Sequence, residues 1–327
     1  IALGGAWCWS LSGKMGPSPK STAKSNVKLL SCKTEKTLDG KENIVLEFAP
    51  GFNGGTFSSS KFPGGKKEAV GEVRWEAKSP LGFAPSLEFL ESPDNFDALP
   101  ANQLWVLYLK NNPIRNHGSE IMKKLARQTN LCALDLESSN IADDDLTVVA
   151  GLKRLKTLSL NNTNITGASL AKLPQLRQLS AISFSDCTGT SALLAALDES
   201  DRLEQLYLDC NSLTPADFKK ISTLKNLFEL QVNNSNMHNT DLASLTSLTK
   251  LNTLDARGCP ITASAIETIK KMGKNGLKKL KLSVDDWSKA DVRTIQKTIP
   301  GAELTINRVR PKDTALTPSD FAGMIKL

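Results

Sequence analysis

The amino-acid sequence predicts an α/β fold in which parallel strands form the concave side of a curved stack and helices form its convex side. Three observations carry this prediction. From residue 104 onward apolar residues recur about every 24 positions, each unit begins with the spacing of a strand, and each unit ends with the spacing of a helix. The chain of 327 residues, 40% of them apolar, is long enough to bury the core that such a stack requires.

Eight leucines mark the beginnings of the repeats. They stand 24 residues apart in the centre and 27 or 26 residues apart at the two ends, at Leu104, Leu131, Leu155, Leu179, Leu203, Leu227, Leu251 and Leu277. Apolar residues follow three and five positions later, which is the period of a strand with one buried face. Apolar residues fifteen and eighteen positions later, present from the second repeat onward, have the three-residue step of a helix packed on that strand.

A column of small polar residues follows each strand pattern. Eight positions after the leucines stand Asn112, Ser139, Thr163, Cys187, Asn211, Ser235, Cys259 and Asp285. With this column the chain resembles the leucine-rich repeat family, whose pattern is L-x-x-L-x-L-x-x-[N/C]-x-L at a period of 20–29 residues. The resemblance covers residues 104 to about 300, and NNTNIT at 161–166 is similar to bacterial repeats of the N-x-I-T type.

The resemblance implies a leucine-rich-repeat solenoid, a horseshoe of about eight repeats with a parallel concave sheet and convex helices. It also implies that the small polar column forms a ladder of hydrogen bonds to the backbone just after each strand. Asn112 and Asn211 match the asparagine of the family, and Cys187 and Cys259 match its cysteine variant. The other members depart from the pattern, but they are still small hydrogen-bonding partners.

Residues that cap helices stand where the helical half of several repeats begins, at Thr166, Thr190, Thr214, Thr262 and Ser288. A threonine or serine at this place accepts a hydrogen bond from a free backbone N–H of the first turn. Pro215, directly after Thr214, adds the signal of a proline at the first helical position. We therefore expect helices to start after these residues.

The ends of a repeat stack need covers, because a terminal repeat otherwise exposes its core. Residues 43–103 contain short alternating runs between glycine-rich turns, so we expect a small β-rich N-terminal cap. The repeats then occupy 104–300. In 301–327 the segment GAELTIN predicts a last strand, and LTPSDF at 316–321 echoes LTPADF at 213–218, which predicts a capping helix.

The first residues differ from the rest of the chain. The opening IALGGAWCWSLSGK predicts that residues 1–13 are the end of a membrane anchor or signal segment, with an arbitrary apolar start or a piece of a buried helix as the alternative. Residues 14–42 are rich in Ser, Lys, Gly and Thr and predict a flexible linker. We expect a membrane-anchored protein of the bacterial cell envelope, with the cytoplasmic side left open.

We find no residue pattern that indicates catalysis, a cofactor or a metal site. The acidic run at 143–145 falls at a predicted helix start, where acids favour the helix dipole. The segment FPGGKK at 62–67 lacks the spacing of a phosphate loop, and neither C-x-x-C nor H-E-x-x-H occurs. Cys187 and Cys259 stand three repeats apart, about 14 Å at ~4.8 Å per strand, which is too far for a disulfide. A carboxylate pair such as Asp135 with Glu137 is the catalytic alternative.

Residues between the buried positions of each strand are expected to face outward on the concave side. Both tyrosines of the chain fall in the column four positions after the leucine. Tyrosines on a rigid sheet are good binding anchors, although exposed strand positions also favour tyrosine without any binding role. The candidate partner-binding residues are Tyr108, Asp135, Glu137, Asn161, Ser183, Tyr207, Asp209, Glu229, Gln231, Asp255, Arg257, Lys279 and Lys281.

The net charge of +7 is concentrated in residues 1–42 and 270–312, and the middle of the chain is mildly acidic. The basic C-terminal end could meet phospholipid or nucleic acid, but a lysine run is more often a solvated face, and few aromatic residues are interleaved for base stacking. We therefore do not expect a nucleic-acid partner.

These features favour a non-enzymatic protein–protein interaction module, tethered to a membrane by its N-terminal segment, that binds a protein ligand on its concave face. The alternative is the ligand-sensing part of a larger membrane receptor, such as a kinase, whose catalytic domain lies upstream of Ile1.

Overall fold

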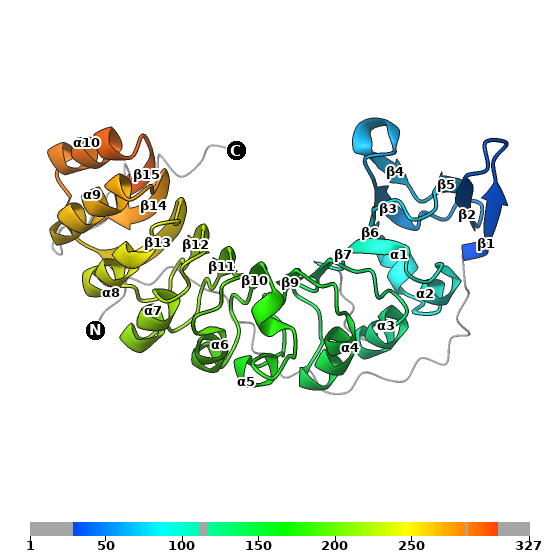
Figure 1. The fold of residues 1–327 in the computed structure, drawn as a ribbon, viewed down its shortest axis with the longest axis horizontal. Coiled ribbons are helices and arrows are strands. Elements are labelled where there is room, and N and C mark those ends of the chain that lie inside the picture. The colour runs from blue at the N-terminus through cyan, green and yellow to red at the C-terminus, as the bar shows by residue number, and fades with distance from the viewer. Residues whose placement is uncertain (1–28, 111–116, 285–286, 307–327) are drawn as a thin grey trace, which may run out of the picture.

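The computed structural model describes residues 29–110, 117–284 and 287–306. Figure 1 shows a curved stack whose strands line the concave side and whose helices line the convex side. The first strands are β1 (Leu29–Lys36), β2 (Glu42–Phe48), β3 (Gly55–Ser58), β4 (Lys66–Glu68), β5 (Glu72–Glu76) and β6 (Leu81–Pro85). The repeats add β7 (Leu104–Tyr108), β8 (Ala133–Asp135), β9 (Thr157–Ser159), β10 (Ala181–Ser183), β11 (Gln205–Tyr207), β12 (Glu229–Gln231), β13 (Thr253–Ile261), β14 (Lys279–Val284) and β15 (Gly301–Ile306).

The helices lie between these strands. They are α1 (Leu87–Leu90), α2 (Asn95–Ala98), α3 (Gly118–Leu125), α4 (Leu146–Gly151), α5 (Gly167–Leu170), α6 (Thr190–Leu197), α7 (Pro215–Ile221), α8 (Asn239–Ser244), α9 (Ile266–Lys274) and α10 (Lys289–Thr298). Short 3-10 turns are η1 (Pro63–Gly65), η2 (Asp143–Asp145), η3 (Leu176–Gln178), η4 (Leu245–Ser247) and η5 (Ala263–Ala265).

The strands form a twelve-stranded sheet in the order β15-β14-β13-β12-β11-β10-β9-β8-β7-β6-β3-β4, and a three-stranded sheet in the order β1-β2-β5. From β6 to β15 every neighbouring pair is parallel, whereas β3 and β4 join the end of the sheet antiparallel. The predicted α/β class with a large, mostly parallel sheet is confirmed.

The parallel strands pair in the register that the repeat predicts. One line of paired residues crosses eight strands through Leu107, Leu134, Leu158, Ile182, Leu206, Leu230, Leu254 and Leu280. All of them are at most 1% exposed. Each such side chain contributes roughly 1.5–3 kcal/mol by leaving water, so this line is the continuous core of the stack.

The helical half of each unit closes this core from the convex side. The residues eighteen positions after the first leucine are buried, as the three-residue step predicts, at Val149, Leu173, Leu197, Ile221, Leu245, Ile269 and Ile295.

Helix starts follow the predicted capping residues in most repeats. Thr166 caps α5, Thr214 caps α7 in a reciprocal box with Asp217, and Ser288 caps α10. Thr262 precedes the short turn η5 without a side-chain capping hydrogen bond. The prediction for the α6 start is wrong, because Thr190 is already the first residue of α6. The capping position belongs to the residue before it, a glycine with φ of 77°, a left-handed conformation that glycine adopts at little cost.

The N-terminal region begins earlier than predicted. The expected linker at 14–42 is wrong for its second half, because Leu29–Lys36 form β1 and 37–41 form the turn into β2. Polar residues can form this strand because its backbone pairs with β2 along its length. An ion pair between Arg74 on β5 and Glu35 on β1, at 2.6 Å, also holds it. Residues 14–28 and the predicted anchor at 1–13 lie outside the described residues.

Aromatic rings join this region to the repeats. Phe57 on β3 stacks on Phe83 of β6 at 4.4 Å between ring centroids, and Phe83 meets Phe89 edge to face at 5.1 Å. Phe96 continues the line at 5.2 Å from Phe89. Because these side chains are fully or nearly fully buried, they cover the core of the first repeat.

At the other end β15 pairs with β14 over six residues, from Gly301 opposite Lys279 to Ile306 opposite Val284. The strand predicted at GAELTIN is therefore present, and the capping helix predicted at 316–321 lies outside the described residues. Within the described residues, no helix is long and apolar enough to cross a membrane.

Candidate interaction surface on the concave sheet

The concave face consists of three lines of side chains, at two, four and six positions after the first leucine. Residues paired across neighbouring strands point to the same side, so each line crosses the sheet. The line at position four runs through Tyr108, Asp135, Ser159, Ser183, Tyr207, Gln231, Asp255, Lys281 and Glu303. The line at position two runs from the cap through Lys66, Ser58, Gly82, Val106, Ala133, Thr157, Ala181, Gln205, Glu229, Thr253 and Lys279.

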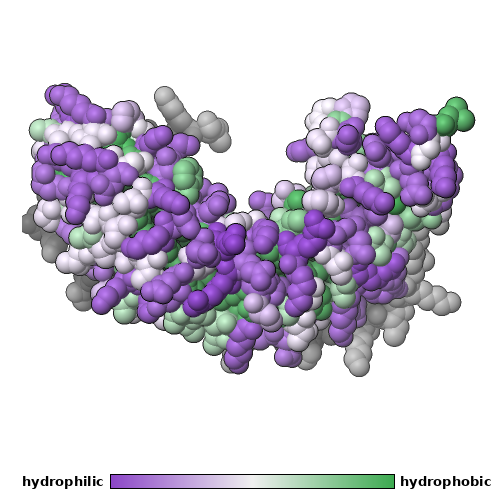
Figure 2. All heavy atoms as spheres, viewed as in Figure 1, coloured by the Kyte–Doolittle hydropathy of each residue, from purple (hydrophilic) through white to green (hydrophobic). Residues whose placement is uncertain are grey.

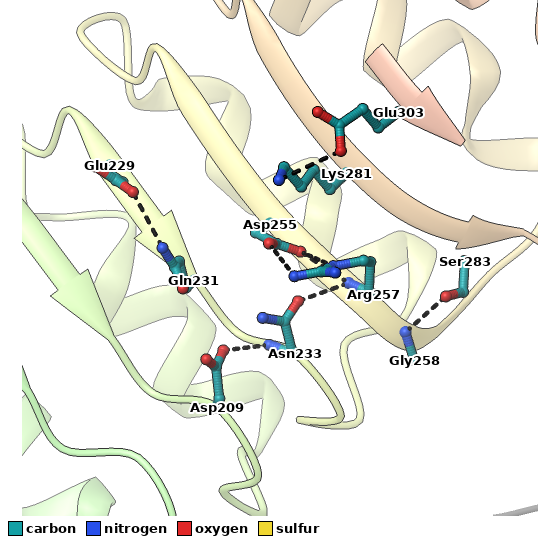
Figure 3. Close-up of polar contacts among 10 residues, drawn as sticks. All are labelled: Asp209, Glu229, Gln231, Asn233, Asp255, Arg257, Gly258, Lys281, Ser283 and Glu303. Carbon is teal, nitrogen blue, oxygen red and sulfur yellow. Dashed lines mark hydrogen bonds and ion pairs between the residues drawn. The ribbon is translucent and has the colours of Figure 1, made fainter. Parts of the chain in front are cut away.

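The side chains at position six form a ladder along the centre of the face. Asn161 Oδ1 accepts a hydrogen bond from the backbone N–H of Ser185 at 2.8 Å, and Ser185 Oγ accepts from that of Asp209 at 2.9 Å. Asp209 Oδ1 accepts from the N–H of Asn233 at 2.7 Å, and Asn233 Oδ1 accepts from that of Arg257 at 2.9 Å (Figure 3). Two predicted binding residues, Asn161 and Asp209, therefore tie one repeat to the next.

The carboxyl group of Asp209 is partly withdrawn from water. Burial raises its pKa, the hydrogen bond from the Asn233 N–H opposes that rise, and the nearby charge of Asp255 adds to it. The net direction is upward. Asp209 is thus held in a place where its negative charge is disfavoured, which is consistent with a structural rather than a solvent-facing side chain.

Asp255 lies beneath Arg257 instead of facing outward as predicted. It is 5% exposed, and the guanidinium of Arg257 covers it with two parallel hydrogen bonds, Nε to Oδ1 at 2.9 Å and Nη2 to Oδ2 at 2.8 Å (Figure 3). A paired charge of this kind can be buried, whereas an unpaired one could not. The surface here is the half-exposed Arg257 side chain, beside the ion pair of Lys281 with Glu303 at 3.3 Å.

Tyr207 and Glu229 form a second tied group in the centre. Burial, the negative charge of Glu229 and a hydrogen bond to it raise the pKa of Tyr207 to about 12. The Glu229 carboxylate also accepts from Gln231 Nε2 at 3.1 Å and from Gln205 Nε2 at 3.4 Å. Tyr207 is therefore half-buried and engaged rather than a free anchor.

The N-terminal end of the face is different. Tyr108 is 44% exposed. Its neighbour on β8, Asp135, accepts from the backbone N–H of Glu137 at 3.2 Å. On the same strand as Tyr108, the half-buried Trp105 lines a hollow of about 420 Å³ at the junction with the cap, and Arg154 lies over its ring at 5.1 Å. Sequence reasoning missed this hollow, because its other walls come from the cap.

The ladder implied by the family resemblance is confirmed. Asn211 Nδ2 donates to the carbonyl of Phe184 at 2.8 Å, and Cys259 Sγ donates to that of Val232 at 3.1 Å, in each case to the residue just after the strand of the preceding repeat. Burial raises the pKa of the thiols of Cys187 and Cys259, which keeps the proton that a donor needs. The first and last members of this column lie outside the described residues.

A further column was not predicted. One position before the ladder the backbone is left-handed in six successive repeats, at Ser138, Asn162, Asp186, Cys210, Asn234 and Gly258. Asparagine, aspartate and glycine tolerate this conformation best, and their recurrence every 24 residues is the signal that could have revealed it. This turn points backbone N–H groups toward the next repeat. For example, the N–H of Asn162 donates a hydrogen bond to the carbonyl of Ser185 at 2.9 Å.

Metal-binding and thiol groups are sparse in the part of the chain that the structure describes. These residues contain no group of three or more His, Cys, Asp or Glu side chains placed to hold a metal ion. Their cysteines are free thiols. The acidic run at 143–145 forms the turn η2 before α4, where Asp145 accepts from the backbone N–H of Ala142 and Asp143 from that of Thr166. These carboxylates are thus used in helix starts, as predicted.

No protein-family model matches the sequence, and no curated protein matches it. Among solved structures, the chain is similar to an internalin (inlF) from Listeria monocytogenes strain 4b F2365, with 20% sequence identity and a TM-score of 0.40 over 62% of this chain and 69% of that chain. A likeness of this size supports no functional conclusion, so the class of the protein rests on its own repeat, register and ladder.

Proposed function

We propose that the chain is a leucine-rich-repeat solenoid of the bacterial type that works as a non-enzymatic protein–protein interaction module, with a protein ligand on the concave face. The observation that carries this proposal is the preorganised concave sheet, in which a ladder of side chains locks successive repeats together while Tyr108 is left 44% exposed. A surface that is already ordered loses little conformational entropy on binding.

The shape and polarity of the face favour a macromolecular ligand. Figure 2 shows a mostly hydrophilic molecule hollowed along this face. Its lines of side chains cross nine parallel strands, which at ~4.8 Å per strand extend for about 40 Å. An exposed tyrosine within a polar surround is typical of the anchors that dominate protein–protein interfaces.

Site-specific photo-crosslinking tests the proposal. A benzophenone amino acid is placed at Tyr108 or Ser159 on the concave face, and at the exposed Ala195 or Ala216 on the convex helices α6 and α7 as matched controls. We expect the same protein adduct from both concave positions and none from the convex ones. Adducts from the convex positions alone would refute a concave site.

We also propose that residues 1–13 tether the module to a membrane of the bacterial cell envelope. Support comes from the apolar opening that ends in two tryptophans. Fractionation of cells that express the chain with and without these residues tests this point: the full chain is expected with the membranes and the shortened chain in the soluble fraction.

A further inference from the structure

The hollow beside Trp105 differs from the rest of the candidate interaction face, which consists of lines of mostly polar side chains. Its walls are Trp105 and Val106 from β7, Leu81 and Gly82 from β6, and Ser58 from β3. The volume of about 420 Å³ falls within the usual ~300–1,000 Å³ of ligand pockets. The half-buried Trp105 and Val106 give it an apolar wall that can receive one large side chain, and Ser58, Ser59 and Ser60 line it as well.

Three cations lie next to residues that line this hollow. Lys66 pairs with Ser58 across β3 and β4, so its side chain emerges on the same side of the sheet as the hollow. Lys61 stands next to the lining residue Ser60, and the guanidinium of Arg154 lies over Trp105 at 5.1 Å. Among the described residues none of these three cations has a carboxylate partner. Arg154 Nη1 donates to Asn130 Oδ1 at 3.2 Å, a neutral partner that leaves its positive charge uncompensated.

Two other hollows among the described residues lack this combination. The hollow of about 360 Å³ around the 47% exposed Phe228 contains Asp201 and Glu204 as well as Arg202 and Lys250, so its charges balance. The convex hollow of about 240 Å³ between α4 and α5 likewise contains both an acid and a lysine. The lining of the hollow beside Trp105, by contrast, contains no acidic residue.

We propose that this hollow binds an acidic peptide segment of the protein ligand, which inserts one large apolar side chain against Trp105 and places carboxylates near Lys61, Lys66 and Arg154. Burial of the inserted side chain supplies affinity, and the cationic rim selects for acids on both sides of it. This inference rests on the proposed function and specifies its ligand.

Peptide selection tests the chemistry while the ligand itself is still unidentified. A phage library of random twelve-residue peptides is selected on the full chain at low salt. We expect enrichment of sequences with an aromatic or large aliphatic residue flanked by Asp and Glu. Enrichment of basic or purely polar sequences, or of none, would overturn the inference.

Variants then place the binding site. For a labelled peptide from the selection, Trp105→Ser is expected to weaken binding about tenfold or more. The double variant of the exposed rim, Lys61→Glu with Lys66→Glu, is expected to weaken it about tenfold and to reduce its dependence on salt. The rim variant keeps the test decisive if Trp105→Ser does not fold, because both lysines are exposed.

Matched controls come from the hollow around Phe228. Phe228 occupies the same position of its repeat as Trp105, and Lys250 lies beside it. Phe228→Ser and Lys250→Glu are expected to change the affinity less than about twofold. Binding that survives the Trp105 and rim variants but is lost in Tyr108→Ala would overturn this inference and leave the proposed function intact. Failure of the proposed function would appear separately, as convex adducts in the crosslinking experiment.

Discussion

The centre and the N-terminal end of the concave face use their outward side chains in different ways. In the centre, from β9 to β13, outward side chains are bonded to the neighbouring repeat, as Asp209 is to Asn233. At the N-terminal end Tyr108 is 44% exposed and Trp105 lines a hollow. The difference teaches that a polar side chain on a repeat surface can be structural, and that exposed or hollow-lining side chains lie where the ladder has not begun.

The small polar column shows the same contrast. At the N-terminal end Ser139 Oγ donates to Leu136 of its own repeat at 2.6 Å. Further along the stack Ser235 Oγ donates to Leu208 of the preceding repeat at 2.9 Å. Bonds between repeats couple neighbours, whereas a bond within a repeat does not. We therefore expect the centre to be the more cooperative and rigid part of the face.

The largest effect is expected from Leu206→Asp, which tests whether the centre and the N-terminal end belong to one cooperative stack. Leu206 is fully buried in β11, so an unpaired carboxylate there should cost more than about 5 kcal/mol and unfold its neighbours. Circular dichroism measures the loss of helix, and fluorescence of the five tryptophans, Trp105 among them, measures the loss of packing. Leu206→Met, which conserves volume, is the control and should cost less than about 1.5 kcal/mol. A soluble, fully folded Leu206→Asp variant would show that the register is wrong.

The next largest effect is expected from removal of a ladder bond between repeats. Asn211→Ala leaves the carbonyl of Phe184 and the N–H of Cys187 without their partner, and should lower the free energy of unfolding by about 2–4 kcal/mol. Ser139→Ala removes one bond within a repeat and should cost about 1 kcal/mol. Urea unfolding followed by circular dichroism gives both values. Equal costs would contradict the distinction between the two kinds of bond.

The tyrosines provide a comparison in binding. Tyr108→Ala should weaken binding of the protein ligand by about 1–3 kcal/mol. It should change the free energy of unfolding by less than about 0.5 kcal/mol. Tyr207→Ala should weaken ligand binding by the same amount. It should also destabilise the fold, because Tyr207 is half-buried beside Glu229. Calorimetric titration with the crosslinked partner, alongside thermal unfolding, separates the two effects. An unchanged affinity in both variants would move the site away from the concave face.

Much of the fold could be predicted because burial leaves a periodic trace in the sequence. Leu206 and its equivalents recur at fixed spacing, so strand, helix and register follow from counting. The strand β1 could not be predicted, because a polar segment such as Leu29–Lys36 is held by backbone pairing with β2 and not by apolar side chains. Thr190 was misplaced by one residue, because the left-handed turn before it depends on backbone conformation.

The candidate site was predicted as a set of positions but not as a set of roles. Tyr108 and Asp209 belong to neighbouring columns and both look outward in a strand pattern. Such a side chain is free unless its oxygen lies within hydrogen-bond distance of a backbone N–H of the next repeat. The spacing of residues in the sequence does not determine that distance. The hollow at Trp105 was missed for a related reason, since its walls come from strands that lie more than twenty residues apart in the chain.

A smaller effect concerns the titration of Tyr207. The chain has two tyrosines, so Tyr108→Phe leaves Tyr207 as the sole source of phenolate absorbance. Its pKa of about 12 should then fall toward the ordinary value of ~10 when Glu229→Gln removes the neighbouring charge. A rapid pH jump measures the absorbance before the protein unfolds. If the pKa of Tyr207 is the same in Tyr108→Phe with and without Glu229→Gln, burial alone raises it.

The smallest effect is expected from Asp209→Asn, which asks whether the central ladder needs a charge at all. Because burial raises the pKa of Asp209 in the folded state, the folded chain holds this proton more readily than the unfolded chain does. Stability should therefore fall as the pH rises from the unfolded value of ~3.9 through the folded pKa, and stay at the lower level above it.

An asparagine at this position has no such dependence, and its amide oxygen can still accept from the N–H of Asn233. We expect Asp209→Asn to match or exceed the original chain at neutral pH by less than about 1 kcal/mol, with the gain disappearing in acid. Urea unfolding across this pH range measures it, and Asp186→Asn, on an exposed turn residue of the preceding repeat, controls for the change in net charge. A loss of stability at neutral pH would show that the carboxylate itself, through the neighbouring Arg257, holds the repeats together, and the centre of the face would then be an electrostatic rather than a hydrogen-bonded structure.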